Sequence, residues 1–180
     1  MSIRDEIKRS VENQQLVLLQ PTLPGSSMKR FIFAVLEIMT LLYFAVPEIM
    51  TLLYGAWTGR EQEIRWKRVC ADLEWFIEGR LIVVGDDGYM KPLDPAEDEV
   101  WEIRCVDPDP SIRIFGRFSE TDVFIALGHH CREELEEKGS VEWAAAIRAC
   151  KADWRKLLLT YPPHSGTSIH DYSSENVVYL

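Results

Sequence analysis

Hydrophobic and polar residues alternate along the middle of the chain with the two-residue period of β-strands. Residues 100–106 and 112–118 each place apolar side chains on one face, and residues 123–127 are apolar throughout, as in a buried strand. Short turn sequences at 107–110 (Asp-Pro-Asp-Pro) and 119–120 (Ser-Glu) separate the three segments. The pattern therefore predicts an antiparallel β-meander.

Apolar residues recur every three or four positions on both sides of this meander, which is the spacing of amphipathic helices. The clearest examples are residues 60–78, which end at Gly79, and residues 141–159. Residues 133–138 and the charged first ten residues also have helical patterns. Helices before and after a meander predict an α+β fold, in which a small antiparallel sheet packs against helices.

The remaining segments are predicted to be short or irregular. Residues 81–84 form a brief apolar strand, and residues 91–98 form a loop. Residues 12–28 are a linker, with a short apolar run at 16–19 that suits at most a brief strand. From position 161 onward, proline, glycine and serine predict a loosely ordered tail.

A tandem repeat occupies positions 33–54, where FAVLEIMTLLY is followed at once by FAVPEIMTLLY. Eleven residues make about three helical turns, so both copies keep their polar side chains on about the same face of a helix. The same insertion in a strand would turn every side chain to the opposite face. The repeat therefore predicts an added apolar helical segment over residues 31–57, interrupted by Pro47.

This apolar segment is long enough to span a membrane. Glu37 and Glu48 oppose a span, because a carboxylate at the centre of the bilayer costs about 2.5–3.5 kcal/mol. A buried helix, or one that contacts a partner or a second copy of the chain, is favoured instead. The chain then divides into an N-terminal segment and linker (1–30), the apolar helical segment (31–58), an α+β domain (59–160) and a tail (161–180).

Composition and charge limit the partners. The 180 residues are 47% apolar and 27% charged, which is typical of a globular protein. The net charge is −9, and residues 61–180 carry 14 basic and 24 acidic side chains. This charge disfavours a broad nucleic-acid-binding surface but leaves room for a small site of clustered arginines.

Cysteine and motif patterns indicate neither disulfides nor a cofactor. The four cysteines are widely spaced without a CxxC pair, and nothing resembling a secretory signal precedes them, so reduced thiols in a cytoplasm are expected. Phosphate-loop, dinucleotide-binding and zinc-protease motifs are missing from the sequence. His129, His130 and Cys131 are consecutive, a spacing that does not suit binding to one metal ion, so no metal site is expected.

The strongest candidates for a catalytic site are Arg104, Arg113, Arg117, His129 and His130. Alternation places the three arginines on one face of the predicted meander, and the histidines follow its last strand. Such a cluster could hold a phosphate group and supply a proton donor. Alternatively, the arginines pair with neighbouring carboxylates as a solvated sheet face.

Five short stretches follow one another between residues 60 and 156: LEWFIEG, MKPLD, VWEIRC, SIRIFGRF and DVFIALGHH. In these stretches the chain resembles the RelE/ParE/HigB-like toxin superfamily, most closely its phage-derived HigB-type branch. The resemblance implies a small antiparallel sheet packed on helices. It also implies metal-independent, ribosome-dependent cleavage of messenger RNA by the RNA 2′-hydroxyl, with an antitoxin protein as partner.

Arg104 and Arg113 match arginines of the family's motifs. Family members carry lysines after the last strand, where this chain has both histidines, Cys131 and Arg132, so Arg132 is a candidate RNA-binding residue. The missing lysines and the acidic charge leave a second hypothesis open. In that hypothesis the chain is a non-catalytic relative of the same fold, which contacts other proteins through its apolar helical segment.

Overall fold

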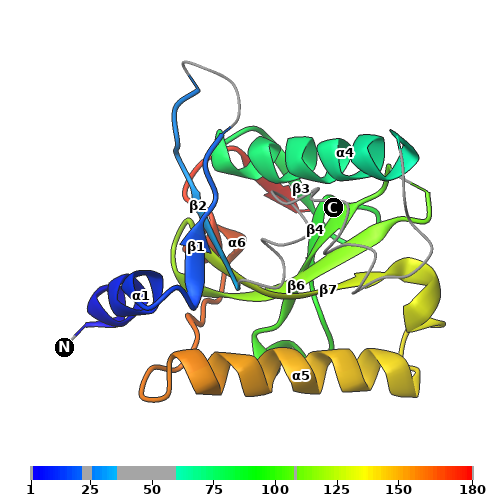
Figure 1. Ribbon diagram of the computed structural model, residues 1–180. Helices are drawn as coiled ribbons and strands as arrows, with labels where there is room; N and C mark the ends of the chain where they lie inside the picture. The colour runs from blue at the N-terminus through cyan, green and yellow to red at the C-terminus, as the bar shows by residue number, and fades with distance from the viewer. Residues whose placement is uncertain (1, 22–25, 36–59, 108, 180) are drawn as a thin grey trace.

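The computed structural model describes residues 2–21, 26–35, 60–107 and 109–179. They form an eight-stranded mixed sheet in the order β1-β2-β7-β6-β5-β4-β3-β8, with helices on both faces (Figure 1). The strands are β1 (Leu16–Leu18), β2 (Phe31–Val35), β3 (Ile82–Val84), β4 (Met90–Pro92), β5 (Trp101–Cys105), β6 (Ile112–Glu120), β7 (Val123–Cys131) and β8 (Val177–Tyr179). The helices are α1 (Ile3–Glu12), α4 (Arg60–Ile77), α5 (Val141–Leu157) and α6 (Ile169–Tyr172), with short 3-10 helices η1 (Ala96–Asp98) and η2 (Arg132–Leu135). The α+β class predicted from the sequence is confirmed.

The predicted meander is present as β5, β6 and β7. Arg104 on β5 is paired with Arg113 on β6, and Arg113 is paired with His130 on β7. Paired residues of neighbouring strands share one face of a sheet, so these three side chains project to the same side. β7 extends to Cys131, four residues past the predicted end, and therefore carries both histidines within the sheet.

Two hydrophobic cores cover the two faces of the sheet. On one face α4 places Phe76 against Phe118 and Phe124, with 6.4 Å between ring centroids in each pair. On the other face α5 places Trp143 against Phe115 in a stacked arrangement at 5.4 Å. Figure 1 shows α4 and α5 on opposite sides of the sheet. Burial on both faces explains why the polar side chains of the meander are not generally solvated.

Residues 31–35 form strand β2, so the predicted helix is wrong over these residues. β2 lies parallel to β7, with Phe31 opposite Val123, and β1 pairs with its other edge in antiparallel fashion. Ile32 and Ala34 are fully buried in the α4-side core. A continuous apolar run suits a buried strand as well as a helix, and pairing with the edge of β7 satisfies its backbone in the sheet.

The remainder of the predicted apolar helical segment, from position 36 to 58, lies outside the described residues. Its Pro47 interruption and its proposed contacts with a partner or a second copy lie there as well. In the part of the chain that the structure describes, no helix is both long and apolar enough to cross a membrane.

The segment after Tyr161 is ordered, in contrast to the loosely ordered tail predicted from its composition. Its helix α6 packs Tyr172 against Trp101 and Phe118, with ring centroids 4.6 and 5.4 Å apart. Its strand β8 then pairs in parallel with β3. Aromatic burial and strand pairing, neither of which is apparent from local composition, hold this segment on the sheet.

Arg30 connects this segment to three others. Its side chain is 2% exposed, and its guanidinium donates to the backbone carbonyls of Arg80, Glu175 and Asn176. The guanidinium also lies 3.5 Å from the carboxylate of Asp122. One buried cation thus joins four segments: the start of β2, the end of α4, the turn before β7 and the entry to β8.

The helix predicted over residues 60–78 is α4, and Gly79 follows it with a φ of +69°, a conformation that glycine adopts without steric cost. The predicted loop over 91–98 contains most of β4 and all of η1, which differs from expectation. The predicted helix over 133–138 is reduced to η2, a single 3-10 segment that ends at Leu135.

Candidate functional site

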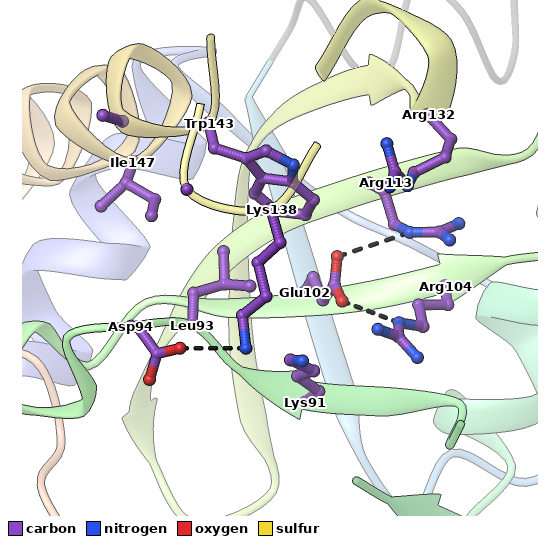
Figure 2. Close-up of a pocket in the computed structure, with 12 residues that line it drawn as sticks. Lys91, Leu93, Asp94, Glu102, Arg104, Arg113, Arg132, Lys138, Trp143 and Ile147 are labelled. Carbon is purple, nitrogen blue, oxygen red and sulfur yellow. Dashed lines mark hydrogen bonds and ion pairs between the residues drawn. The ribbon is translucent and has the colours of Figure 1, made fainter. Parts of the chain in front are cut away.

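A pocket lies between the sheet and the N-terminal end of α5 (Figure 2). Its volume is about 410 Å³, which is in the range of small-molecule sites. We name it the cationic pocket. Its charged lining consists of Lys91, Asp94, Glu102, Arg104, Arg113, Arg132 and Lys138, and its apolar wall includes Leu93, Trp143 and Ile147.

Glu102 is the buried centre of the charged lining. Its side chain is 0% exposed, and its Oε1 accepts a hydrogen bond from Arg104 Nε at 2.7 Å. Its Oε2 lies 3.4 Å from Arg113 Nε. The strand register creates this arrangement, because Arg104 and Arg113 are paired and Glu102 is two residues earlier on the same face of β5. One carboxylate therefore orients two guanidinium groups.

Two lysines lie at the edge of the pocket. Lys138, from the turn before α5, places its Nζ 3.0 Å from Asp94 Oδ2, and both side chains are more than half exposed. Figure 2 shows this pair extending across the front of the pocket. Lys91, on β4, pairs with the exposed carboxylate of Asp86. The Lys138–Asp94 pair is exposed and therefore weak, so Lys138 can exchange its carboxylate partner for another anion at small cost.

The pocket is positively charged in an otherwise acidic chain. Its lining holds five cations and two carboxylates, whereas the whole chain has a net charge of −9. Burial lowers the pKa of Arg113, and the charges of Arg104 and Arg132 lower it further, while Glu102 opposes them. Arginine nevertheless remains protonated in proteins. Cations held this close together attract an anion.

The predicted site residues Arg104, Arg113 and Arg132 are thus brought together, and Arg117 is not. Arg117 projects to the same face of β6, but its guanidinium lies 5.4 Å from the ring centroid of Trp154. It donates to the backbone carbonyls of Asp98 and Glu99. Arg117 therefore anchors η1 and α5 to the sheet and does not line the pocket.

The two histidines lie on opposite faces of the sheet. His130 is paired with Arg113, and its ring lies 5.2 Å from Phe115 on the α5 side. It is beside the pocket and does not form part of its lining. His129 is paired with Ile114, which belongs to the α4-side core, so it is separated from the arginines by the sheet. The prediction that both histidines accompany the arginines is wrong for His129.

Consecutive residues of a strand point to opposite faces, and a β-bulge determines which of the two histidines shares the face of the arginines. Phe115 is paired with Gly128, but the next residue, Gly116, is paired with Ala126, which leaves Leu127 as an extra residue on β7. One extra residue reverses the alternation of all later side chains on that strand. Without the bulge, His129 would lie on the face of Leu127, Arg113 and Phe115.

His129 gives the protein a pH-dependent stability. Burial, with a smaller contribution from the charge of His130, lowers the pKa of His129 to about 4 from its ordinary 6.5. As the pH falls, the imidazole of His129 is therefore protonated in the unfolded chain at a higher pH than in the folded protein. The contribution of neutral His129 to the free energy of unfolding is fully present above pH 6.5. It is expected to be lost as the pH falls from 6.5 to 4, a loss of up to about 3 kcal/mol.

Urea denaturation of the wild type and His129→Gln at pH 7 and pH 4.5 measures this loss. The variant is expected to lose less stability on acidification than the wild type. Asp72 acts in the opposite direction, because burial raises its pKa to about 6 and stability from its neutral form is lost as the pH rises. The exposed His170→Gln variant is the control, and equal losses in wild type and His129→Gln would contradict the prediction.

Sequence reasoning missed the two lysines and the tryptophan of the pocket. Lys91 and Lys138 lie in segments interpreted as a loop and as a helix, and the strand β4 and the turn before α5 aim them at the pocket. Trp143 fits the apolar period of the helix predicted over residues 141–159, and that period alone gives no indication of a pocket residue. The Ser140 hydroxyl caps this helix by accepting from the backbone N–H of Trp143 at 3.2 Å, which fixes the indole in the first turn.

Comparisons of the chain with protein-family models, curated proteins and solved structures found no match. Within the described ranges, no group of three histidine, cysteine, aspartate or glutamate side chains is arranged to hold a metal ion. The arginines and lysines that line the pocket suit the binding of an anion that carries several acceptor oxygens.

Proposed function

We propose that the protein binds RNA, with one phosphate group of the strand held in the cationic pocket. The observation that carries this proposal is the convergence of Arg104, Arg113 and Arg132 with two lysines around one cavity. Guanidinium groups match phosphate oxygens in geometry, and lysines add compact positive charge. The acidic surroundings repel a polyanion, so binding depends on contacts inside this pocket rather than on a broad basic surface.

The resemblance to RelE/HigB-like toxins supports RNA as the ligand. Two of the lining arginines, Arg104 and Arg113, are those that match the family's motifs. The lysines that family members carry after the last strand are replaced in sequence, but Lys91 and Lys138 bring lysine charge to the pocket from other elements. The antiparallel strands β5–β7 between α4 and α5 agree with the sheet and helices that the resemblance implies.

Cleavage of the strand would follow the same resemblance. Attack of the 2′-hydroxyl on the adjacent phosphorus breaks the bond to the 5′-oxygen, and charge builds up on the phosphate oxygens. Arg113 and Arg104 stabilise that charge. One proton leaves the 2′-hydroxyl and one must reach the departing oxygen, and His130, opposite Arg113 in the sheet, is our candidate for this transfer.

Induced expression of the wild type beside Arg113→Gln and His130→Gln tests the proposal. The wild type is expected to arrest growth and deplete messenger RNA, and both variants are expected to relieve this effect. In vitro, Arg113→Gln should weaken binding of a single-stranded RNA about tenfold, because it removes a charged hydrogen-bond donor. The RNA affinity of His130→Gln should stay near that of the wild type.

Arg148→Gln is the matched control, since Arg148 is an exposed arginine on α5 that does not line the pocket. Its growth arrest and RNA affinity should equal those of the wild type. RNA binding that is unchanged by Arg113→Gln, or that is weakened equally by Arg113→Gln and Arg148→Gln, would reject the pocket as the binding site.

Binding of RNA without cleavage is the second candidate function. It is favoured by the lining itself, whose titratable groups are arginines, lysines, Glu102 and Asp94, with no histidine among them. In that case the purified protein binds RNA in a manner that depends on Arg113, but RNA stays intact and growth of induced cells is normal. The expression experiment therefore separates the two candidates.

A further inference from the structure

Trp143 has a hydrogen-bond donor that the folded chain does not use. Its indole Nε1 is buried and has no hydrogen-bond partner, a condition shared within the described part of the chain by Trp101 Nε1 and one Glu102 oxygen. The residue is 7% exposed and lines the cationic pocket. A buried donor without an acceptor costs free energy, and buried polar groups in native proteins are nearly always paired.

The indole ring is held in a fixed position. It stacks on the ring of Phe115, with the two ring centroids 5.4 Å apart and 25° between the ring planes. The guanidinium carbon of Arg132 lies 5.9 Å from the indole centroid. Figure 2 shows the indole nitrogen on the side of the ring that faces Arg113 and Arg132. The unused N–H therefore belongs to the same corner of the pocket as two guanidinium groups.

We propose that Trp143 is an anion-binding residue, whose Nε1–H donates to an oxygen of a phosphate group that Arg113 and Arg132 also hold. This inference rests on the proposed function and adds a third donor to the phosphate site. A phosphate group presents several acceptor oxygens in a tetrahedral arrangement, so donors from three separate side chains can each reach one. A carboxylate offers two oxygens in one plane, which a single guanidinium fork satisfies.

Trp101 provides a matched comparison. Its Nε1 also has no partner, and its ring is buried between Phe118 and Tyr172. These contacts place it in the α4-side core, on the opposite face of the sheet from the pocket. The two tryptophans share burial and an unused N–H, but only Trp143 lines the pocket.

Calorimetric titration with inorganic phosphate and with a short single-stranded RNA tests the inference on wild type, Trp143→Phe and Trp101→Phe. Trp143→Phe keeps an aromatic ring against Phe115 and removes the donor. It is expected to weaken both affinities about tenfold, the effect of losing one hydrogen bond to a charged group. Trp101→Phe should leave both affinities unchanged.

A tryptophan analogue with sulfur in place of the indole N–H, introduced at position 143 alone, removes the donor while keeping the ring size. The analogue protein should show the same tenfold loss of affinity that is expected for Trp143→Phe. It also provides the test if Trp143→Phe folds poorly. Wild-type affinities in the analogue protein would overturn the inference and leave the proposed function standing. Failure of the wild type itself to bind phosphate and RNA would instead reject the proposed function, and the inference with it.

Discussion

Glu102→Gln is expected to destabilise the protein by about 3 kcal/mol and, at the same time, to strengthen anion binding. The carboxylate is fully buried between Arg104 and Arg113, whose side chains are 17% and 10% exposed. Glutamine has nearly the same shape but no charge, so two largely buried guanidinium groups would lose their shared counterion. A phosphate in the pocket would then supply the missing negative charge.

Urea denaturation measures the stability change, and calorimetric titration with inorganic phosphate measures the affinity change. Glu137→Gln is the control, because Glu137 is exposed and does not line the pocket. It should alter neither quantity by a comparable amount. A stability loss without any gain in phosphate affinity would mean that the anion does not bind at these arginines.

Arg30→Met is expected to lower the free energy of unfolding by a similar amount, about 3 kcal/mol. Methionine retains part of the buried hydrocarbon but provides no donors. The carbonyl oxygens of Arg80 and Glu175 would lose their partner, and Asp122 would lose its buried cation. The effect should be greatest where these segments meet, at the entry to β8.

Hydrogen exchange distinguishes this local effect from a general loss of stability. Amides of β8 and of the segment before it should exchange faster in Arg30→Met than in the wild type, even where global unfolding is negligible. Lys29→Met is the control, since the neighbouring Lys29 is exposed. Equal exchange at β8 in both variants would show that Arg30 does not anchor the segment.

Local periodicity was sufficient to predict the elements that have a long, regular hydrophobic pattern of their own. α4, α5 and the meander β5–β7 follow from it, and the glycine stop at Gly79 follows from composition. β2 and β8 could not be found in this way. Each pairs in parallel with a strand far away in the sequence, and the apolar period of the tandem repeat favours a helix more strongly than the few residues of β2 favour a strand.

The candidate site was partly predictable for the same reason. Alternation along β5 and β6 places Arg104 and Arg113 together, because those strands are paired without irregularity at that end. The histidines depend on the bulge at Leu127, which no pattern in the sequence marks. Lys91, Lys138 and Trp143 reach the pocket from three elements whose mutual positions are set by tertiary packing.

The topology of the sheet also has a consequence for the order in which the protein assembles. Its centre, β5–β7, joins strands connected by short turns, and such hairpins close quickly. At its flanks, Phe31 pairs with Val123 and Ile82 pairs with Val177. Each of these pairings must close a long loop, at a cost in chain entropy, before its stabilising contacts can form. We therefore expect folding to proceed from the middle of the sheet outward, with the edges of β7 and β3 open to misassociation until the flanking strands pair with them.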